Sequence, residues 1–363
     1  MTSPSPLRWG VSVQLGERRV LRQGRWRWVR AMAWLLLLFF LTAAAVGLPL
    51  QVVVDLVPPG DGLGALVGPL VGSAAALGGY VLAVRLGEGR WPGELSLRPA
   101  LPGLAVGAIL GLVMMTVLMG TMIVTGLYDI TLVGAAPLWT GLGLALQAAV
   151  TEELWMRALL LRLLWRAFGP VPAFAVSALV FGGLHLANPG ATWLGGATVT
   201  AAGLMFCALY GLTGRLWAPT GLHLAWNFAQ GSLFGAVVSG GGLGDSIAVS
   251  TTRPGAAAWL TGGSFGPEGS VFALLLVGAM TVSALWLARK SYGGRLSGRT
   301  SGDPGRMGLR HAVRRGLPGQ HPGPARARPG HLGAEGQRVG GDRAGTGQPG
   351  SDHRARQSGG PGR

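Results

Sequence analysis

The stretch TEELWMRALLLRLL, residues 151–164, places Glu152, Glu153 and Arg157 among residues that are almost all apolar. On a helix, Glu153 and Arg157 stand four residues apart, which is the spacing of an intrahelical ion pair. Glu152 lies about 100° around the helix from Glu153, so its carboxylate can point into a cavity. This pattern predicts one carboxylate neutralised by an arginine and a second one available as a base.

Two later segments carry the other ionisable and amide groups within apolar sequence. FGGLH (181–185) ends in His185, and its two glycines allow a neighbouring helix to come close. HLAWN (223–227) places His223 and Asn227 on one helix face, one turn apart. Ionisable groups are costly inside a membrane, where they face the bundle interior or a wet cavity and mark functional sites. We therefore expect these groups to form one site rather than only hydrogen bonds between helices.

Two kinds of hydrolytic chemistry fit this set of side chains. Two histidines and a carboxylate are common zinc ligands, so His185, His223 and Glu152 are the candidate metal ligands. The HExxH motif is absent, however, because a leucine follows each histidine. In the metal-free alternative, a poorly solvated carboxylate takes a proton from water, and a His and an Asn stabilise the oxyanion. We favour the metal-free site without a cofactor, and zinc is the alternative.

The helices that position these groups are predicted from the distribution of charge. The chain is 49% hydrophobic and only 12% charged, whereas about 25% of the residues of a soluble domain are charged. Uncharged runs of about 18 or more apolar residues are typical of membrane spans. The longest run contains two spans, because Asn188-Pro189-Gly190 breaks it. We predict an all-α, polytopic membrane bundle of about eight transmembrane helices from the runs 31–54, 62–84, 101–128, 130–151, 167–214, 216–244 and 269–288.

Loop charges orient this bundle and divide the chain into three parts. Arg-rich loops alternate with loops poor in Lys and Arg, so the positive-inside rule places both termini in the cytoplasm of a multi-pass cell-membrane protein. We expect a basic cytoplasmic N-terminus (1–30), a transmembrane domain (31–288) and a Gly/Arg/Pro-rich tail (289–363). The tail has 15 Lys and Arg residues against 4 Asp and Glu residues. Its composition predicts disorder, and also allows an out-of-frame translation of GC-rich DNA.

Three motifs in this sequence resemble those of a known family. EELWMR (152–157), FGGLH and HLAWN are similar to the EExxxR, FxxxH and HxxxN motifs of the CPBP family, the CAAX proteases and bacteriocin-processing enzymes of membranes. They occur in this order on successive predicted helices, and the resemblance covers about 137–240. It implies a CPBP-like protease domain and an intramembrane endopeptidase activity.

The resemblance also implies a role for each matching residue. Glu152 would activate the water molecule, supported by Glu153 and Arg157. His185 would orient the water or bind the intermediate, and His223 with Asn227 would stabilise the oxyanion. Members of the family have been described both as metalloproteases and as metal-independent glutamate proteases, so the resemblance leaves the place of zinc open.

The partners follow from the membrane location and from composition. We expect a membrane-associated protein or peptide as substrate and the lipid bilayer as surroundings. Tyr292 is the one aromatic residue among the arginines of the tail sequence, so nucleic-acid binding is not expected. The ratio of 29 Arg to 1 Lys indicates a bacterial origin, which disfavours a prenylated substrate. The competing hypothesis is a non-proteolytic membrane protein, a bacteriocin immunity factor or a transporter component, that uses the same polar cluster for binding.

Overall fold

The computed structural model describes residues 13–56 and 62–300 of the chain. These residues are mostly helical, as the apolar runs predict, because a backbone in lipid must satisfy its hydrogen bonds internally. The α-helices are α1 (Arg27–Leu56), α2 (Gly62–Gly87), α3 (Ala100–Val124), α4 (Trp139–Glu153), α5 (Arg162–Phe168), α6 (Pro170–His185), α7 (Trp193–Thr213), α8 (Trp217–Phe228), α9 (Ala258–Thr261) and α10 (Val271–Thr300).

Each of the seven uncharged runs contains an α-helix, and the longest run, 167–214, contains two, α6 and α7. These eight helices are not equal in length. Within the described part of the chain, five are long and apolar enough to cross a membrane, namely the spans in α1, α2, α3, α7 and α10. The protein is therefore a multi-pass membrane protein. The remaining three, α4, α6 and α8, are shorter and hold the predicted site residues other than Arg157. The predicted break at Asn188-Pro189-Gly190 is confirmed, since α6 ends at His185 and α7 begins at Trp193.

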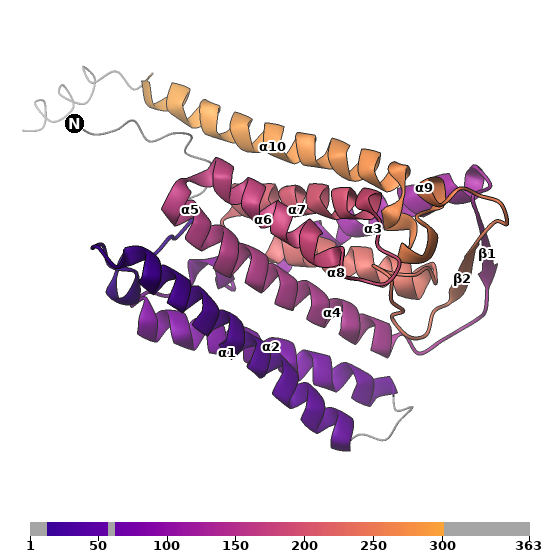
Figure 1. Cartoon of the computed structure of the whole chain (residues 1–363), viewed down its shortest axis with the longest axis horizontal. Coiled ribbons are helices and arrows are strands. Elements are labelled where there is room, and N and C mark those ends of the chain that lie inside the picture. Colours follow the sequence, from indigo (N-terminus) through magenta and orange to yellow (C-terminus); the bar gives the residue numbers. More distant parts are fainter. Residues whose placement is uncertain (1–12, 57–61, 301–363) are drawn as a thin grey trace, which may run out of the picture. The chain divides into compact units, whose positions relative to one another are not determined.

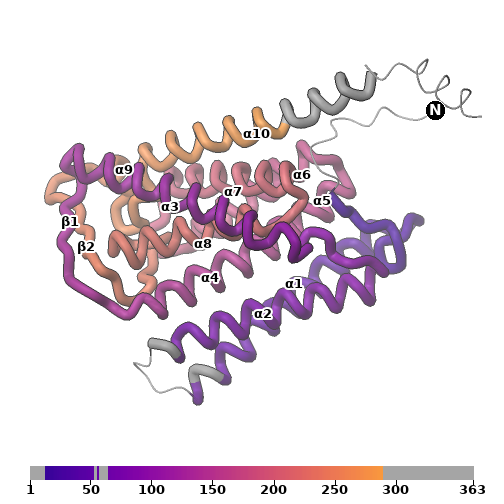
Figure 2. Tube along the Cα trace, turned by 180° about the vertical axis from the view of Figure 1, so that it is seen from behind, coloured from indigo at the N-terminus to yellow at the C-terminus, as the bar shows by residue number. Residues whose placement is uncertain are grey.

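The helices pack around α4, α7 and α8. The α1–α2 pair lies along α4, and α10 lies along α7 on the other side of the bundle (Figures 1 and 2). Between them, α3 and α4 both pack against α8, and α6 packs against α7. The three short helices with the predicted site residues are therefore held between the longer ones.

Small residues allow α3 and α8 to pack with their backbones in contact. A Cβ on Gly107 or Gly111 of α3 would overlap a carbonyl oxygen of α8, and a Cβ on Gly221 of α8 would overlap the Leu104 carbonyl of α3. In lipid, helices associate mainly by such close packing and interhelical hydrogen bonds. This contact fixes the depth and rotation of α8, which carries His223 and Asn227.

The helix that carries Glu152 and Glu153 changes its geometry directly after them. A π-helical segment, Leu154–Leu161, follows α4 without a break and continues into α5. Segments of π-helix are rare and occur often at functional sites, because the extra residue per turn shifts side chains to new directions. Arg157 lies in this segment, so its direction is set by π rather than α geometry.

A short antiparallel sheet adds to the predicted all-α fold. Strand β1 (Tyr128–Leu132) pairs with β2 (Ala248–Thr252), with Tyr128 opposite Thr252. Strand β2 lies between two predicted runs, whereas the last three residues of β1 belong to the run 130–151, which predicts a helix. Both strands contain the β-branched residues that favour extended structure. The Tyr128 hydroxyl donates a hydrogen bond to the carbonyl of Thr261 at 2.9 Å, which ties the sheet to α9.

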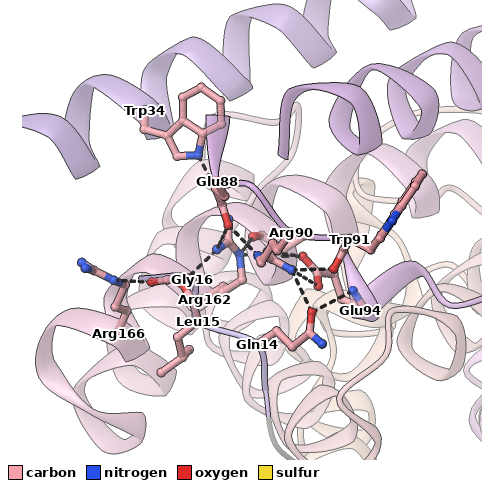
Figure 3. A network of polar contacts seen from close by, with 12 residues as sticks. Gln14, Leu15, Gly16, Trp34, Glu88, Arg90, Trp91, Glu94, Arg162 and Arg166 are labelled. Atoms are coloured by element: carbon pink, nitrogen blue, oxygen red, sulfur yellow. Dashed lines mark hydrogen bonds and ion pairs between the residues drawn. The ribbon is translucent and has the colours of Figure 1, made fainter. Parts of the chain in front are cut away.

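A buried cluster of charges joins the α2–α3 loop to the start of α5 (Figure 3). Arg162 pairs with Glu88 at 2.6 Å, and Arg90 pairs with Glu94 at 2.8 Å. Burial opposes the charge on both glutamates, but the guanidinium groups of Arg162 and Arg90 hold the pKa of Glu88 and of Glu94 below the ordinary value. The cluster is therefore electrically balanced, with two cations and two anions.

The same cluster holds the segment that precedes α1. Arg162 donates to the carbonyl of Leu15 at 3.1 Å, and Arg166 donates to the carbonyl of Gly16 at 2.7 Å (Figure 3). The described part of the predicted basic N-terminus is thus bound to α5 through backbone carbonyl groups. These hydrogen bonds fix α5, the C-terminal part of the continuous helix that begins with α4.

The predicted C-terminal tail overlaps the end of the last helix. The backbone of α10 stays helical to Thr300, twelve residues beyond the predicted boundary at 288. The predicted disorder of the rest of the tail concerns residues 301–363, which lie outside the described residues.

Candidate active site

The two adjacent glutamates at the end of α4 lie in different surroundings. The side chain of Glu152 is 30% exposed, whereas that of Glu153 is completely buried. This difference follows from their angular separation of about 100° on a helix, which leaves one carboxylate partly exposed and directs the other into the core. The prediction that one of them remains accessible is in agreement with this geometry.

Glu153 bridges two partners. Its Oε1 atom lies 3.0 Å from Nη1 of Arg157 and 3.1 Å from Nδ1 of His223. The predicted ion pair with Arg157 is therefore present. The contact with His223 was not expected, because the sequence predicts that Glu153 faces only the arginine.

Arg157 is fully buried and has three kinds of partner. Besides Glu153, its guanidinium donates to the carbonyl oxygen of Gly203 at 3.3 Å. Its central carbon lies 4.8 Å from the ring centres of both Phe181 and Phe206. A buried charge is tolerated only when it is paired and hydrogen-bonded, and aromatic faces attract cations further. These contacts hold Arg157 in one position and so fix Glu153.

Both histidines direct one ring nitrogen toward Glu152. The Nε2 atoms of His223 and His185 lie 3.7 Å and 3.9 Å from Oε2 of Glu152. On the opposite side of each ring, Nδ1 faces an oxygen atom, Glu153 Oε1 for His223 and the carbonyl of Phe181 at 2.9 Å for His185. Because a carbonyl oxygen only accepts, Nδ1 of His185 carries the hydrogen, and Nε2 of the neutral ring is an acceptor.

Oε2 of Glu152 is the acceptor at the centre of this arrangement. It is buried, and no group in the described residues donates a hydrogen bond to it. The two Nε2 atoms are too far away for direct hydrogen bonds, which need about 2.7–3.2 Å. The carboxylate oxygen and the two imidazoles therefore face a common space in which each can contact a third group.

A pocket opens beside the two histidines. Asn227, one turn after His223, lines it together with His185 and His223. The ring of Phe206 stacks on His223, with 5.2 Å between the ring centres and 20° between the planes, and so fixes the imidazole plane. The structure thus brings the six predicted residues into one region. His185, His223 and Asn227 line the pocket, whereas Glu152, Glu153 and Arg157 do not line it and lie within 4 Å of a histidine or of one another.

The candidate metal ligands were tested by their spacing. Donor atoms around a tetrahedral zinc ion at about 2.0–2.1 Å are about 3.3 Å apart, and the two distances from Glu152 Oε2 are 3.7 and 3.9 Å. Over residues 13–56 and 62–300, no group of three or more His, Cys, Asp and Glu could hold a metal ion. The donor types would suit zinc, but their spacing here does not, so the mechanism below uses only the protein's own groups.

Two parts of the site were not predicted from the sequence. Gly203 and Phe206 of α7 complete the surroundings of Arg157, although α7 has no motif residue. Glu268, in the turn before α10, lines the pocket beside Asn227. The local sequence offers one signal for it, because Glu268 directly precedes the uncharged run 269–288.

The comparisons with known proteins agree with the location of this site. Residues 134–229 match the family model described as type II CAAX prenyl endopeptidase Rce1-like. The searches of curated proteins and of solved structures gave no match. The matched segment runs from just before α4 to the end of α8 and includes the six predicted site residues. The match confirms that the chain resembles the CPBP family of CAAX proteases over the segment that holds the candidate active site.

Proposed function

We propose that this protein is an intramembrane endopeptidase that cleaves a membrane-associated protein or peptide with a water molecule activated by Glu152. The observation that carries the proposal is the position of Glu152 Oε2, a buried acceptor that receives no hydrogen bond from residues 13–56 or 62–300 and is flanked by two imidazole nitrogens at 3.7 and 3.9 Å. The family match implies an endopeptidase of the CAAX type over the same residues.

In the proposed reaction, Glu152 removes a proton from water, and the oxygen attacks the carbonyl carbon of the scissile peptide bond. His185 orients this water, because its Nε2 is an acceptor while Nδ1 is bound to the Phe181 carbonyl. The attack breaks the carbonyl π bond and gives a tetrahedral intermediate with a negative oxygen. Glu152 then passes its proton to the amine nitrogen as the C–N bond breaks.

Asn227 and His223 are the proposed donors to the negative oxygen. The amide of Asn227 can donate from the wall of the pocket. His223 in its protonated form donates from Nδ1 to Glu153 and from Nε2 into the site, with the buried carboxylate balancing its charge. Such donors stabilise charge that develops in the transition state, and each is worth about 10²–10³ in kcat.

We also propose that both termini lie in the cytoplasm. Arg19 donates to the carbonyl of Leu86 at 2.6 Å, and Arg166 donates to that of Gly16, so the basic ends of α1, α2 and α5 are together. Basic loops collect on the cytoplasmic side of a membrane. The opposite end carries the β1–β2 sheet.

The test replaces Glu152 by glutamine, which keeps the shape of the side chain and removes its proton affinity. Cells expressing each variant are compared by mass spectrometry for new peptide ends in membrane proteins, and the rate of one identified cleavage is then measured with purified protein. Glu152→Gln should lower this rate by at least about 10²-fold. Asp129→Asn makes the same chemical change on an exposed carboxylate of β1 and should cleave normally. Cleavage that survives Glu152→Gln would refute the proposal and favour the binding-protein alternative.

A further inference from the structure

A second buried carboxylate lies in the pocket next to the proposed catalytic residues. Glu268 belongs to the turn Pro267–Gly269, outside the segment that matches the family model. Its residue is only 5% exposed, and it lines the same pocket as His185 and Asn227. The proposed reaction does not use this carboxylate, so its presence in the pocket needs another explanation.

Glu268 is held in place by two side-chain donors. The hydroxyl of Ser239 donates to Oε1, and the indole nitrogen of Trp226 donates to Oε2 at 3.3 Å. A carboxylate has about four acceptor positions, so these donors leave part of its capacity unused. In the described residues, no Lys, Arg or His lies within the 4.0 Å of an ion pair with Glu268.

The rest of the pocket wall is mostly apolar. The ionisable side chains in its wall are Glu268 and the two histidines of the proposed site. An isolated buried carboxylate is costly unless a cation or further donors compensate it. A ligand that fits these walls needs an apolar stem, and one that satisfies the carboxylate needs a cation at its tip. The apolar lining consists of Phe181, Val199, Ala202, Met205, Phe206, Leu222, Trp226 and Val277.

We propose that Glu268 is a specificity-determining residue that binds the cationic side chain of a lysine or arginine next to the scissile bond. Lysine and arginine bury their methylene stems along apolar surfaces while the charged end finds a polar partner. The location of the pocket beside His185, His223 and Asn227 places such a side chain close to the bond that is cut. The cleavage part of this inference rests on the proposed function, but the binding of the cation does not.

The first experiment measures binding without requiring proteolysis. The purified protein is titrated with n-butylammonium, which has the stem and charge of a lysine side chain, and separately with 1-butanol, and thermal unfolding is followed. The ammonium compound should stabilise the wild-type protein more than the alcohol does. Glu268→Gln should weaken its apparent affinity at least about 10-fold, whereas Asp129→Asn, the same change on an exposed residue, should leave it unaltered. Equal responses of the wild-type protein to the two compounds would overturn the proposal.

The second experiment reads the preference from the cleaved substrates. Around the new peptide ends produced by the wild-type protein, lysine or arginine should be enriched at one position. Glu268→Gln should reduce the ratio of kcat/KM for a lysine peptide to that for its norleucine analogue by about 10²-fold. A purely structural role would lower both values together and leave the ratio unchanged, which would refute the proposal. Glu268→Asp keeps the charge and should retain the direction of the preference, which separates selectivity from folding.

These two results also separate this proposal from the proposed function. Cleavage without a preference for a basic residue, combined with equal binding of the two probes, would refute the role of Glu268 and leave the proteolysis intact. Selective binding of n-butylammonium by a protein whose substrates are cleaved even with Glu152→Gln would support the cation site and refute the catalytic mechanism.

Discussion

Replacement of Arg157 by methionine tests whether the buried ion pair holds the candidate site together. Methionine fills much of the volume of arginine but cannot pair with Glu153 or donate to the Gly203 carbonyl. Glu153, which is completely buried, would be left with His223 as its partner. Breaking a buried pair by removing one partner costs about 3–5 kcal/mol, because the remaining charge is left uncompensated.

The chain provides a matched control at the opposite end of the bundle. Arg253 pairs with Asp129 at 2.9 Å, but both side chains are more than half exposed. Exposed pairs contribute about 0–1 kcal/mol, so Arg253→Met should have little effect. The loss in free energy of unfolding caused by Arg→Met is thus expected to differ by several kcal/mol between the two positions.

The assay is unfolding in detergent micelles, followed by circular dichroism, for both single variants and for Glu153→Gln/Arg157→Met. The double variant should be more stable than Arg157→Met alone, because neutral glutamine no longer needs a buried counter-charge. Coupling energies of residues in contact are about 0.5–3 kcal/mol. Equal destabilisation by Arg157→Met and Arg253→Met would refute the burial argument. A double variant less stable than Arg157→Met would refute the electrostatic explanation.

Three further predictions concern catalysis, pH and metal. Asn227→Ala should lower the cleavage rate by about 10²–10³-fold through loss of an oxyanion donor. An unfolding temperature equal to that of the wild-type protein would show that the fold is intact. An unaltered cleavage rate would remove Asn227 from the mechanism. The pKa of Glu88 and of Glu94 is lowered in the folded protein. The stability that these groups contribute is therefore present at a pH above their pKa in the unfolded chain, about 4.3, and is lost as the pH falls through their lower pKa in the folded protein. Thermal unfolding measured across this range should be less pH-dependent in Glu88→Gln/Glu94→Gln, and an identical profile would contradict the assignment. Chelation of the purified protein should leave cleavage unaltered, and stoichiometric zinc whose removal abolishes cleavage would make Glu152, His185 and His223 metal ligands.

The convergence of the motif residues could be predicted because each motif occupies one helix with uncharged flanks. Helical spacing alone separates Glu152 from Glu153 and pairs Glu153 with Arg157, and the structure shows this pair at 3.0 Å. The helix boundaries could be predicted less well from the sequence. The apolar run 130–151 predicts a helix from its first residues, but α4 begins at Trp139 because Tyr128–Leu132 pairs with β2.

The parts of the site that the sequence did not predict depend on contacts between distant segments. Glu153 contacts His223 because α4 packs against α8, a contact that hydropathy does not encode. Glu268 reaches the pocket because its turn is fixed against the chain near Gly240, whose backbone nitrogen donates to the Phe265 carbonyl at 2.9 Å. Loop positions of this kind follow from tertiary packing and not from local periodicity.

The contacts of His223 give the second glutamate of the motif a physical role. One ring nitrogen of His223 faces Glu153, which Arg157 holds, and the other faces Glu152. Arg157 therefore acts on the proposed base only through Glu153 and His223. If Glu153 faced Arg157 alone, the pair would be a structural element without influence on the imidazole. Because Glu153 is shared, its charge anchors the arginine and, in the proposed reaction, would also stabilise a protonated His223. Glu153 would then orient the imidazole, while Glu152 would transfer the proton.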